Sequence, residues 1–171
     1  MAQVNRIVED VRKHGDDAVI RYVNRFDAPR LYIGSLRVSD SEFKLAGRRV
    51  DRTFSRALNR AVTQITAFHK NQVQRSWIDT DRPGTMLGQL IHPVDSAGVY
   101  VPGGTSGQTP LVSSVLMGAI PAKIAGVDQV VMVTPPRKDG TIHPYLLVAA
   151  RKVGVDAVFK IGSAWAIAAL A

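Results

Sequence analysis

The residues with the clearest chemical potential lie together in the stretch Gly98-Val99-Tyr100-Val101-Pro102-Gly103-Gly104. Its valines and tyrosine predict a buried strand, because such side chains suit a covered, pleated surface. Gly103 and Gly104 follow the strand end, where glycine lets the backbone turn sharply and come close to a ligand. A strand, a glycine turn and a helix in this order are typical of α/β proteins that bind nucleotides or phosphates. The motif is neither Gly-x-Gly-x-x-Gly nor a P-loop, so a plain structural turn stays open as the alternative.

Two aromatic residues flank this predicted edge. Tyr100 lies beside the glycine turn, and Trp165 comes just after the last predicted strand. Because parallel strands align their carboxyl ends, both rings could border one crevice and contact a bound ligand. The alternative for Tyr100 is a core tyrosine whose hydroxyl is satisfied internally. Ser163 is predicted to cap the last helix.

Three strand–helix units position these residues. Continuous β-branched or apolar runs predict the strands, and apolar segments ended by glycine predict the helices. The strands are predicted at 99–101, 129–134 and 157–161, and the helices at about 112–125, 143–153 and 163–171. Such units imply parallel strands joined by right-handed crossovers. We therefore expect an α/β protein with a Rossmann-like lobe over residues 97–171, preceded by a helix-rich segment over residues 1–96.

The helix-rich segment carries part of a large positive charge. The chain has 22 Lys and Arg against 14 Asp and Glu, a net charge of +8. A long helix is predicted over about 50–74, with arginine at every fourth position of one face: Arg48, Arg52, Arg56 and Arg60. This face is open to three interpretations: a solvated surface, a surface for an anionic partner, or a subunit contact. No aromatic residues alternate with the arginines and no nucleic-acid-binding motif accompanies them, so we do not expect a nucleic-acid partner.

Composition excludes several kinds of chemistry. The chain has no cysteine, which excludes disulfides, cysteine nucleophiles, zinc–thiolate sites and iron–sulfur clusters. Its four histidines show no metal-ligand spacing. The N-terminus lacks the apolar core of a signal peptide, and no apolar run is long enough to cross a membrane, so we expect a cytoplasmic protein. The residues alone predict an anion- or nucleotide-binding α/β lobe without an identifiable catalytic set.

Several longer motifs together resemble the histidinol dehydrogenase family. They are distributed over nearly the whole chain, and the longest follow the predicted linker at 92–97. The motifs are Arg25-Phe26-Asp27, Ala67-Phe68-His69, the glycine-turn stretch 98–104, Ser114-Val115-Leu116-Met117, Ala119-Ile120-Pro121-Ala122-Lys123-Ile124-Ala125-Gly126, Val131-Met132-Val133-Thr134-Pro135-Pro136 and Ala166-Ile167-Ala168-Ala169-Leu170-Ala171.

The resemblance implies a fold and a reaction. The family has an aldehyde-dehydrogenase-like fold with incomplete Rossmann-like lobes, and it works as a homodimer. It oxidises L-histidinol, a small amino alcohol, to L-histidine in two NAD-dependent steps, and it uses zinc. Tyr100 matches the tyrosine that contacts NAD, and Gly103 and Gly104 belong to the same motif. The chain stops at Ala171, short of the family length, so the resemblance implies an N-terminal portion that is inactive alone, with the zinc ligands and general base lying later.

Two departures from the family bear on the cofactor. The family usually has Gly-Gly-Ala-Gln where this chain has Gly162-Ser163-Ala164-Trp165, and that glutamine contacts NAD. Trp165, the corresponding residue, offers one N–H donor and no acceptor. The loop at 105–112 is also longer than usual, which could reshape the crevice. Two alternatives therefore stay open: a related alcohol dehydrogenase with another substrate, and a non-enzymatic binding module of the same fold that uses the arginine face.

Overall fold

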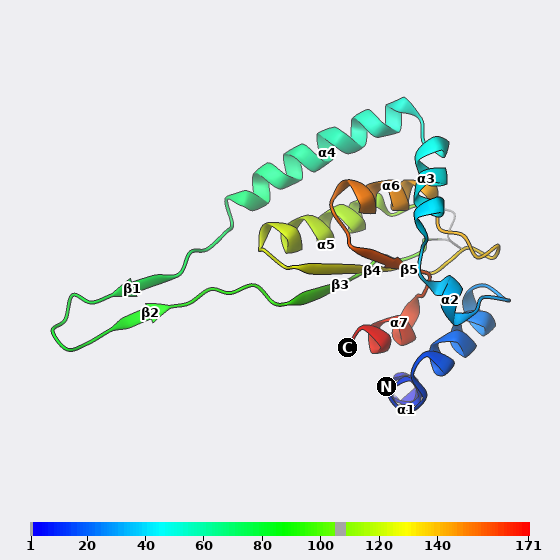
Figure 1. The fold of residues 1–171 in the computed structure, drawn as a ribbon, viewed down its shortest axis with the longest axis horizontal. Coiled ribbons are helices and arrows are strands. Elements are labelled where there is room, and N and C mark those ends of the chain that lie inside the picture. Colours follow the sequence, from blue (N-terminus) through cyan, green and yellow to red (C-terminus); the bar gives the residue numbers. More distant parts are fainter. Residues whose placement is uncertain (1, 105–108) are drawn as a thin grey trace.

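The computed structural model describes residues 2–104 and 109–171. A parallel sheet of three strands lies at the centre, with helices on both faces and a long hairpin that projects to one side (Figure 1). The strands, in the order β3-β4-β5, are β3 (Ser96–Tyr100), β4 (Gln129–Val133) and β5 (Ala157–Phe159). The predicted α/β fold with parallel β-α-β units is confirmed.

The register of the sheet brings the carboxyl ends of its strands level with one another. Tyr100 pairs with Val133, and Val133 pairs with Phe159. The pairing continues one step beyond β3, because the Val101 amide donates to the Val133 carbonyl at 2.9 Å. The turns that follow the three strands therefore start at the same edge of the sheet, which we call the carboxyl edge.

Two layers of helices cover one face of the sheet. The inner layer consists of α5 (Val112–Ile124) and α6 (Pro144–Lys152), and the outer layer of α3 (Asp40–Arg49) and α4 (Arg52–Lys70). Contacts join α3 to α6 and α4 to α5. Ala46 and Leu58 from the outer helices share one buried cluster with Val99 and Met132 of the sheet. The chain before and after residue 96 thus builds a common core, and the proposed boundary at 96 and 97 stays a prediction.

The other face of the sheet packs against the two ends of the chain. Here lie α1 (Ala2–Tyr22), the π-helical turn η1 (Val23–Asp27), α2 (Ile33–Leu36) and α7 (Ser163–Leu170). A second buried cluster joins α1 and α7. Glycine in β3 permits the close approach of α7, because a Cβ atom on Gly98 would lie 2.8 Å from the Leu170 Cδ1 atom.

The hairpin consists of β1 (Trp77–Asp79) and β2 (Leu87–Gln89), which pair antiparallel. It extends from the end of α4 far beyond the helices, as Figure 1 shows. Residues 70–96 are exposed without exception. Among the helices of the described ranges, none is long and apolar enough to cross a membrane.

Candidate functional site

Tyr100 stands at the carboxyl edge and is accessible to solvent. It is the last residue of β3, and 38% of its surface is exposed. Its hydroxyl oxygen accepts a hydrogen bond of 3.4 Å from the Ser163 amide, at the start of α7. A tyrosine ring therefore lies beside a helix N-terminus, where the backbone amides favour negative charge. The ring is too exposed for the alternative of a core tyrosine, although its hydroxyl is satisfied internally, as that alternative requires.

The glycines of the turn after β3 permit close packing between neighbouring turns. A Cβ atom on Gly103 would lie 2.6 Å from the Pro135 Cγ atom, and one on Gly162 would lie 2.6 Å from the Pro135 Cβ atom. Pro135 thus packs between the turn that follows β3 and the turn that follows β5. Gly104 has φ +60°, and a Cβ atom there would lie 2.5 Å from the Thr109 carbonyl oxygen. Both glycines of the motif are accordingly required by the turn itself.

Ser163 adopts a backbone conformation that favours glycine. Its φ is +58°, in the left-handed region, at the position where the family motif quoted above has glycine. The prediction that Ser163 caps the last helix is wrong. Gly162 is the N-cap residue, and no side chain of the described ranges caps α7. Ser163 instead forms the first residue of the helix and directs its amide to the Tyr100 hydroxyl.

Trp165 lies in the protein interior. Only 6% of its surface is exposed, and its indole stacks on Tyr22 at a centroid distance of 5.3 Å and on Phe26 at 5.5 Å. No hydrogen bond or ring contact joins Trp165 to Tyr100 in the part of the chain that the structure describes. The structure therefore brings Tyr100, Gly103 and the start of α7 together at the carboxyl edge, whereas the Trp165 ring anchors α7 to α1 and η1.

Sequence reasoning assigned no chemistry to Asp27, the last residue of η1. Burial raises the pKa of its carboxyl group from 3.8 to about 6, while the charge of Lys138 and the nearby Trp165 indole oppose this rise. Within the described ranges, neither Asp27 Oδ2 nor Trp165 Nε1 completes a hydrogen bond. Lys138 Nζ donates to the Asp27 carbonyl oxygen at 2.9 Å. The Arg25-Phe26-Asp27 motif marked this residue, but no spacing rule indicated its burial.

The predicted arginine face requires a correction. Arg48 belongs to α3, and the chain turns before α4, where the Asp51 side chain accepts from the Phe54 amide at 2.7 Å. Only three of the four arginines, Arg52, Arg56 and Arg60, share the exposed side of α4. The four-residue spacing of the arginines therefore continues across two helices, and the cap residue Asp51 separates them.

The described residues provide no site for a metal ion. Residues 2–104 and 109–171 contain no group of three or more His, Asp or Glu side chains that could hold one. The longer loop, which we expected to reshape the crevice, includes residues 105–108, which lie outside the described residues.

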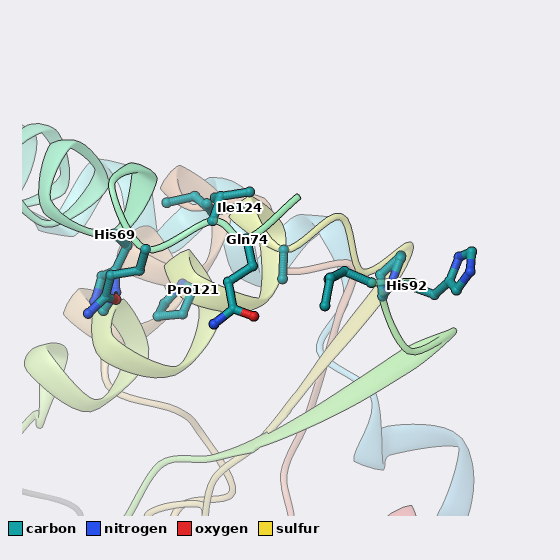
Figure 2. Close-up of a pocket in the computed structure, with 10 residues that line it drawn as sticks. His69, Gln74, His92, Pro121 and Ile124 are labelled. Carbon is teal, nitrogen blue, oxygen red and sulfur yellow. Dashed lines mark hydrogen bonds between the residues drawn. The ribbon is translucent and has the colours of Figure 1, made fainter. Parts of the chain in front are cut away.

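A pocket of about 350 Å³ lies at the opposite, amino edge of the sheet. The end of α4, the base of the hairpin and the end of α5 form its walls. Figure 2 shows His69 and His92 at opposite ends of this pocket, with Gln74 between them. The two histidines are therefore not arranged as a pair of metal ligands.

Comparisons with known proteins agree with this architecture. The family model described as histidinol dehydrogenase matches residues 1–171. The histidinol dehydrogenase of Desulfotalea psychrophila is 52% identical over 168 residues, which are 98% of this chain and 39% of that protein. That of Heliobacterium mobile is 48% identical over 169 residues, again 39% of its length.

A solved structure shows the same fold. The crystal structure of histidinol dehydrogenase from Elizabethkingia anophelis is 33% identical and superimposes with a TM-score of 0.89, over 98% of this chain and 38% of that one. The chain thus spans about 39% of the length of the curated relatives it matches. Sequence and fold together show that this chain belongs to the histidinol dehydrogenase family.

Proposed function

We propose that this chain is the N-terminal portion of an NAD- and zinc-dependent histidinol dehydrogenase, and that its carboxyl edge forms one wall of the NAD site. The observation that carries the proposal is the position of Tyr100. In a chain of this family, an accessible tyrosine ring lies beside the first amide of α7. Oxidation of L-histidinol to L-histidine is the corresponding reaction, within amino-acid biosynthesis in the cytoplasm.

Several residues of the carboxyl edge suit the binding of a dinucleotide, but the Trp165 ring does not contact it. Tyr100 offers a ring face for stacking and a hydroxyl for a polar contact. The start of α7 offers amides and the positive end of a helix dipole to a pyrophosphate group. The turn at Gly103 and Gly104 lets the backbone approach the cofactor. Trp165 acts indirectly, because its buried indole holds α7 in place. When bound, NAD accepts the hydride from the alcohol carbon.

Zinc does not fit the described residues by themselves, because they contain no ligand set. We assign the zinc ligands and the acid–base residues to the part of the family sequence that this chain does not match. The chain alone is accordingly inactive, and homodimer formation belongs to the complete enzyme. The small amino alcohol substrate is also proposed on the family relationship.

Titration of the chain with NAD, followed by amide NMR, tests the proposal. We expect chemical shift changes to cluster at Tyr100, Gly103 and Ser163. Tyr100→Leu should weaken binding about fivefold or more, as expected when a stacking contact of ~1 kcal/mol is lost. Tyr145→Phe is the matched control, because its hydroxyl is already bonded to Asp51 at 3.2 Å on another part of the surface. Shift changes that avoid the carboxyl edge, or an unaltered affinity in Tyr100→Leu, would overturn the assignment.

A further inference from the structure

The hairpin exposes apolar side chains on both of its faces. Trp77 pairs with Gln89, and Asp79 with Leu87, so these four side chains share one face. Ile78 lies on the other face, and continued alternation places Met86 and Leu90 there. The five apolar residues are each 54% to 72% exposed: Trp77, Ile78, Met86, Leu87 and Leu90. A two-stranded hairpin is only marginally stable in water, and exposed apolar patches of this kind mark interaction sites.

The pocket at the base of the hairpin continues this surface. Ile91 and Pro93, which follow the hairpin, line the pocket together with Pro121 and Ile124 of α5; Figure 2 labels the two α5 residues. His69 closes one end. These residues make the pocket largely apolar, and residues 72–74 and 91–93, at the base of the hairpin, form part of its wall.

The His69 ring leaves one hydrogen-bonding requirement unmet. Its Nδ1 atom lies 2.6 Å from the Gln72 Oε1 atom. An amide oxygen only accepts, so Nδ1 carries the proton and Nε2 presents a lone pair. Nε2 is buried and has no hydrogen-bond partner in the ranges that the structure describes. An unpaired ring nitrogen of this kind indicates that the described residues leave the pocket unfilled.

We infer that residues 71–95 and the pocket at their base form the docking surface for the part of a histidinol dehydrogenase that this chain does not match. That partner covers both faces of the hairpin and closes the pocket beside the His69 ring. The inference rests on the proposed function for the identity of the partner, and it adds the surface by which the two parts associate.

Two observations favour this occupant. The chain corresponds to only 39% of the relatives' length, so more than half of such an enzyme remains to pack against this portion. Residues 71–95 are also close to balanced in charge, with Arg75 and Arg82 against Asp79, Asp81 and Asp95. This balance favours an apolar protein surface over an anionic ligand. A hairpin with two apolar faces needs a partner that closes over both of them.

Co-expression of this chain with the unmatched remainder of the Desulfotalea psychrophila protein tests the inference. We expect a 1:1 complex by light scattering. Trp77 emission should shift to the blue on association, whereas Trp165 is already buried and should change little. The ring ¹⁵N resonances of His69 should also shift as the partner closes the pocket.

Charge substitutions on the two faces locate the contact. Ile78→Asp and Leu87→Asp, on opposite faces, should each weaken association about tenfold or more, as for central interface residues. Gln64→Asp, at an exposed site of α4, is the matched control and should leave association unchanged. Because all three sites are exposed, unfolding curves of the chain alone should coincide with that of the wild type.

Three results would overturn the inference. The first is recovery of the chain without the remainder. The second is association that neither hairpin variant weakens. The third is self-association of the chain alone that Ile78→Asp abolishes, which would identify a second copy as the occupant. None of these results depends on Tyr100, so the NAD titration tests the proposed function independently of them.

Discussion

Pro135 lies against Gly103 so closely that a Cβ atom on Gly103 would stand 2.6 Å from the proline Cγ atom. This contact joins the turn after β3 to the turn after β4. Packing against Pro135 is therefore enough to explain why residue 103 is glycine, and no ligand is needed for that explanation. The same contact holds the turn that follows Tyr100 in a fixed position, so packing and the proposed binding of NAD depend on the same backbone.

Gly103→Ala should destabilise the protein by about 1–3 kcal/mol, the usual cost of forcing an extra methyl group into a packed site. Gly47→Ala is the control, because no atom of the described residues lies within 4 Å of a Cβ atom there in α3. That substitution should stabilise the helix by about 0.5–1 kcal/mol. Urea unfolding measures both changes. Equal effects of the two substitutions would contradict the close contact with Pro135.

Ser163→Gly should raise stability by about 0.5–1 kcal/mol. A non-glycine residue at φ +58° costs about 1–2 kcal/mol in backbone strain, and the greater freedom of glycine in the unfolded chain offsets part of the relief. Ala57→Gly, at an exposed position inside α4, should instead cost ~1 kcal/mol. Calorimetry of the two variants compares them directly. Loss of stability in both would show that Ser163 is unstrained.

Trp165→Gln, which restores the glutamine of the family motif, should destabilise the fold by about 3 kcal/mol or more, because it removes a buried ring. The ring stacks on Tyr22 at 5.3 Å and Phe26 at 5.5 Å. Trp77→Gln makes the same change at a site that is 54% exposed and should cost less than about 0.5 kcal/mol. Similar unfolding midpoints for the two variants would argue against Trp165 as the anchor of α7.

The pH dependence of the free energy of unfolding should show the contribution of the Asp27 carboxyl group. Burial raises the pKa of its carboxyl group from 3.8 to about 6, so the folded state binds the proton more tightly than the unfolded state. This contribution to stability is present at low pH and is lost as the pH rises from about 4 to about 6. Asp27→Asn should remove that decline and should be more stable than the wild type above about pH 7.

Asp139→Asn provides the comparison of opposite sign. Hydrogen bonds from the Thr141 hydroxyl and amide lower the pKa of Asp139, so its ionised form favours folding and the variant should lose stability at neutral pH. Urea midpoints measured across this pH range follow both effects. A wild-type pH profile in Asp27→Asn would exclude Asp27 as the source of the decline.

The sequence predicted the central sheet well, because its strands are continuous β-branched runs and glycine ends the intervening helices. Val130 and Met132 are fully buried, as such runs require. The periodicity did not predict the helix boundary at Asp51, because the four-residue spacing of the arginines continues from Arg48 to Arg52. Residue spacing on its own does not report where a helix is interrupted.

The candidate site was only partly predictable. The position of Tyr100 at the strand end followed from local pattern alone. The burial of Trp165 depends on Tyr22 and Phe26, which are distant in sequence, so no local rule could predict it. The Ser163 backbone is likewise set by tertiary packing, since its amide is directed to the hydroxyl of Tyr100 on another element. Contacts between distant segments decided each of these features.

NADH formation from L-histidinol and NAD tests the role of Tyr100 most directly, when measured for the complex between this chain and the unmatched remainder of the Desulfotalea psychrophila protein. The chain alone should form no NADH, and the complex should form it. Tyr100→Leu in the complex should raise the KM for NAD and leave the KM for histidinol unchanged. An unchanged KM for NAD in that variant, or NADH formation by the chain alone, would contradict the account.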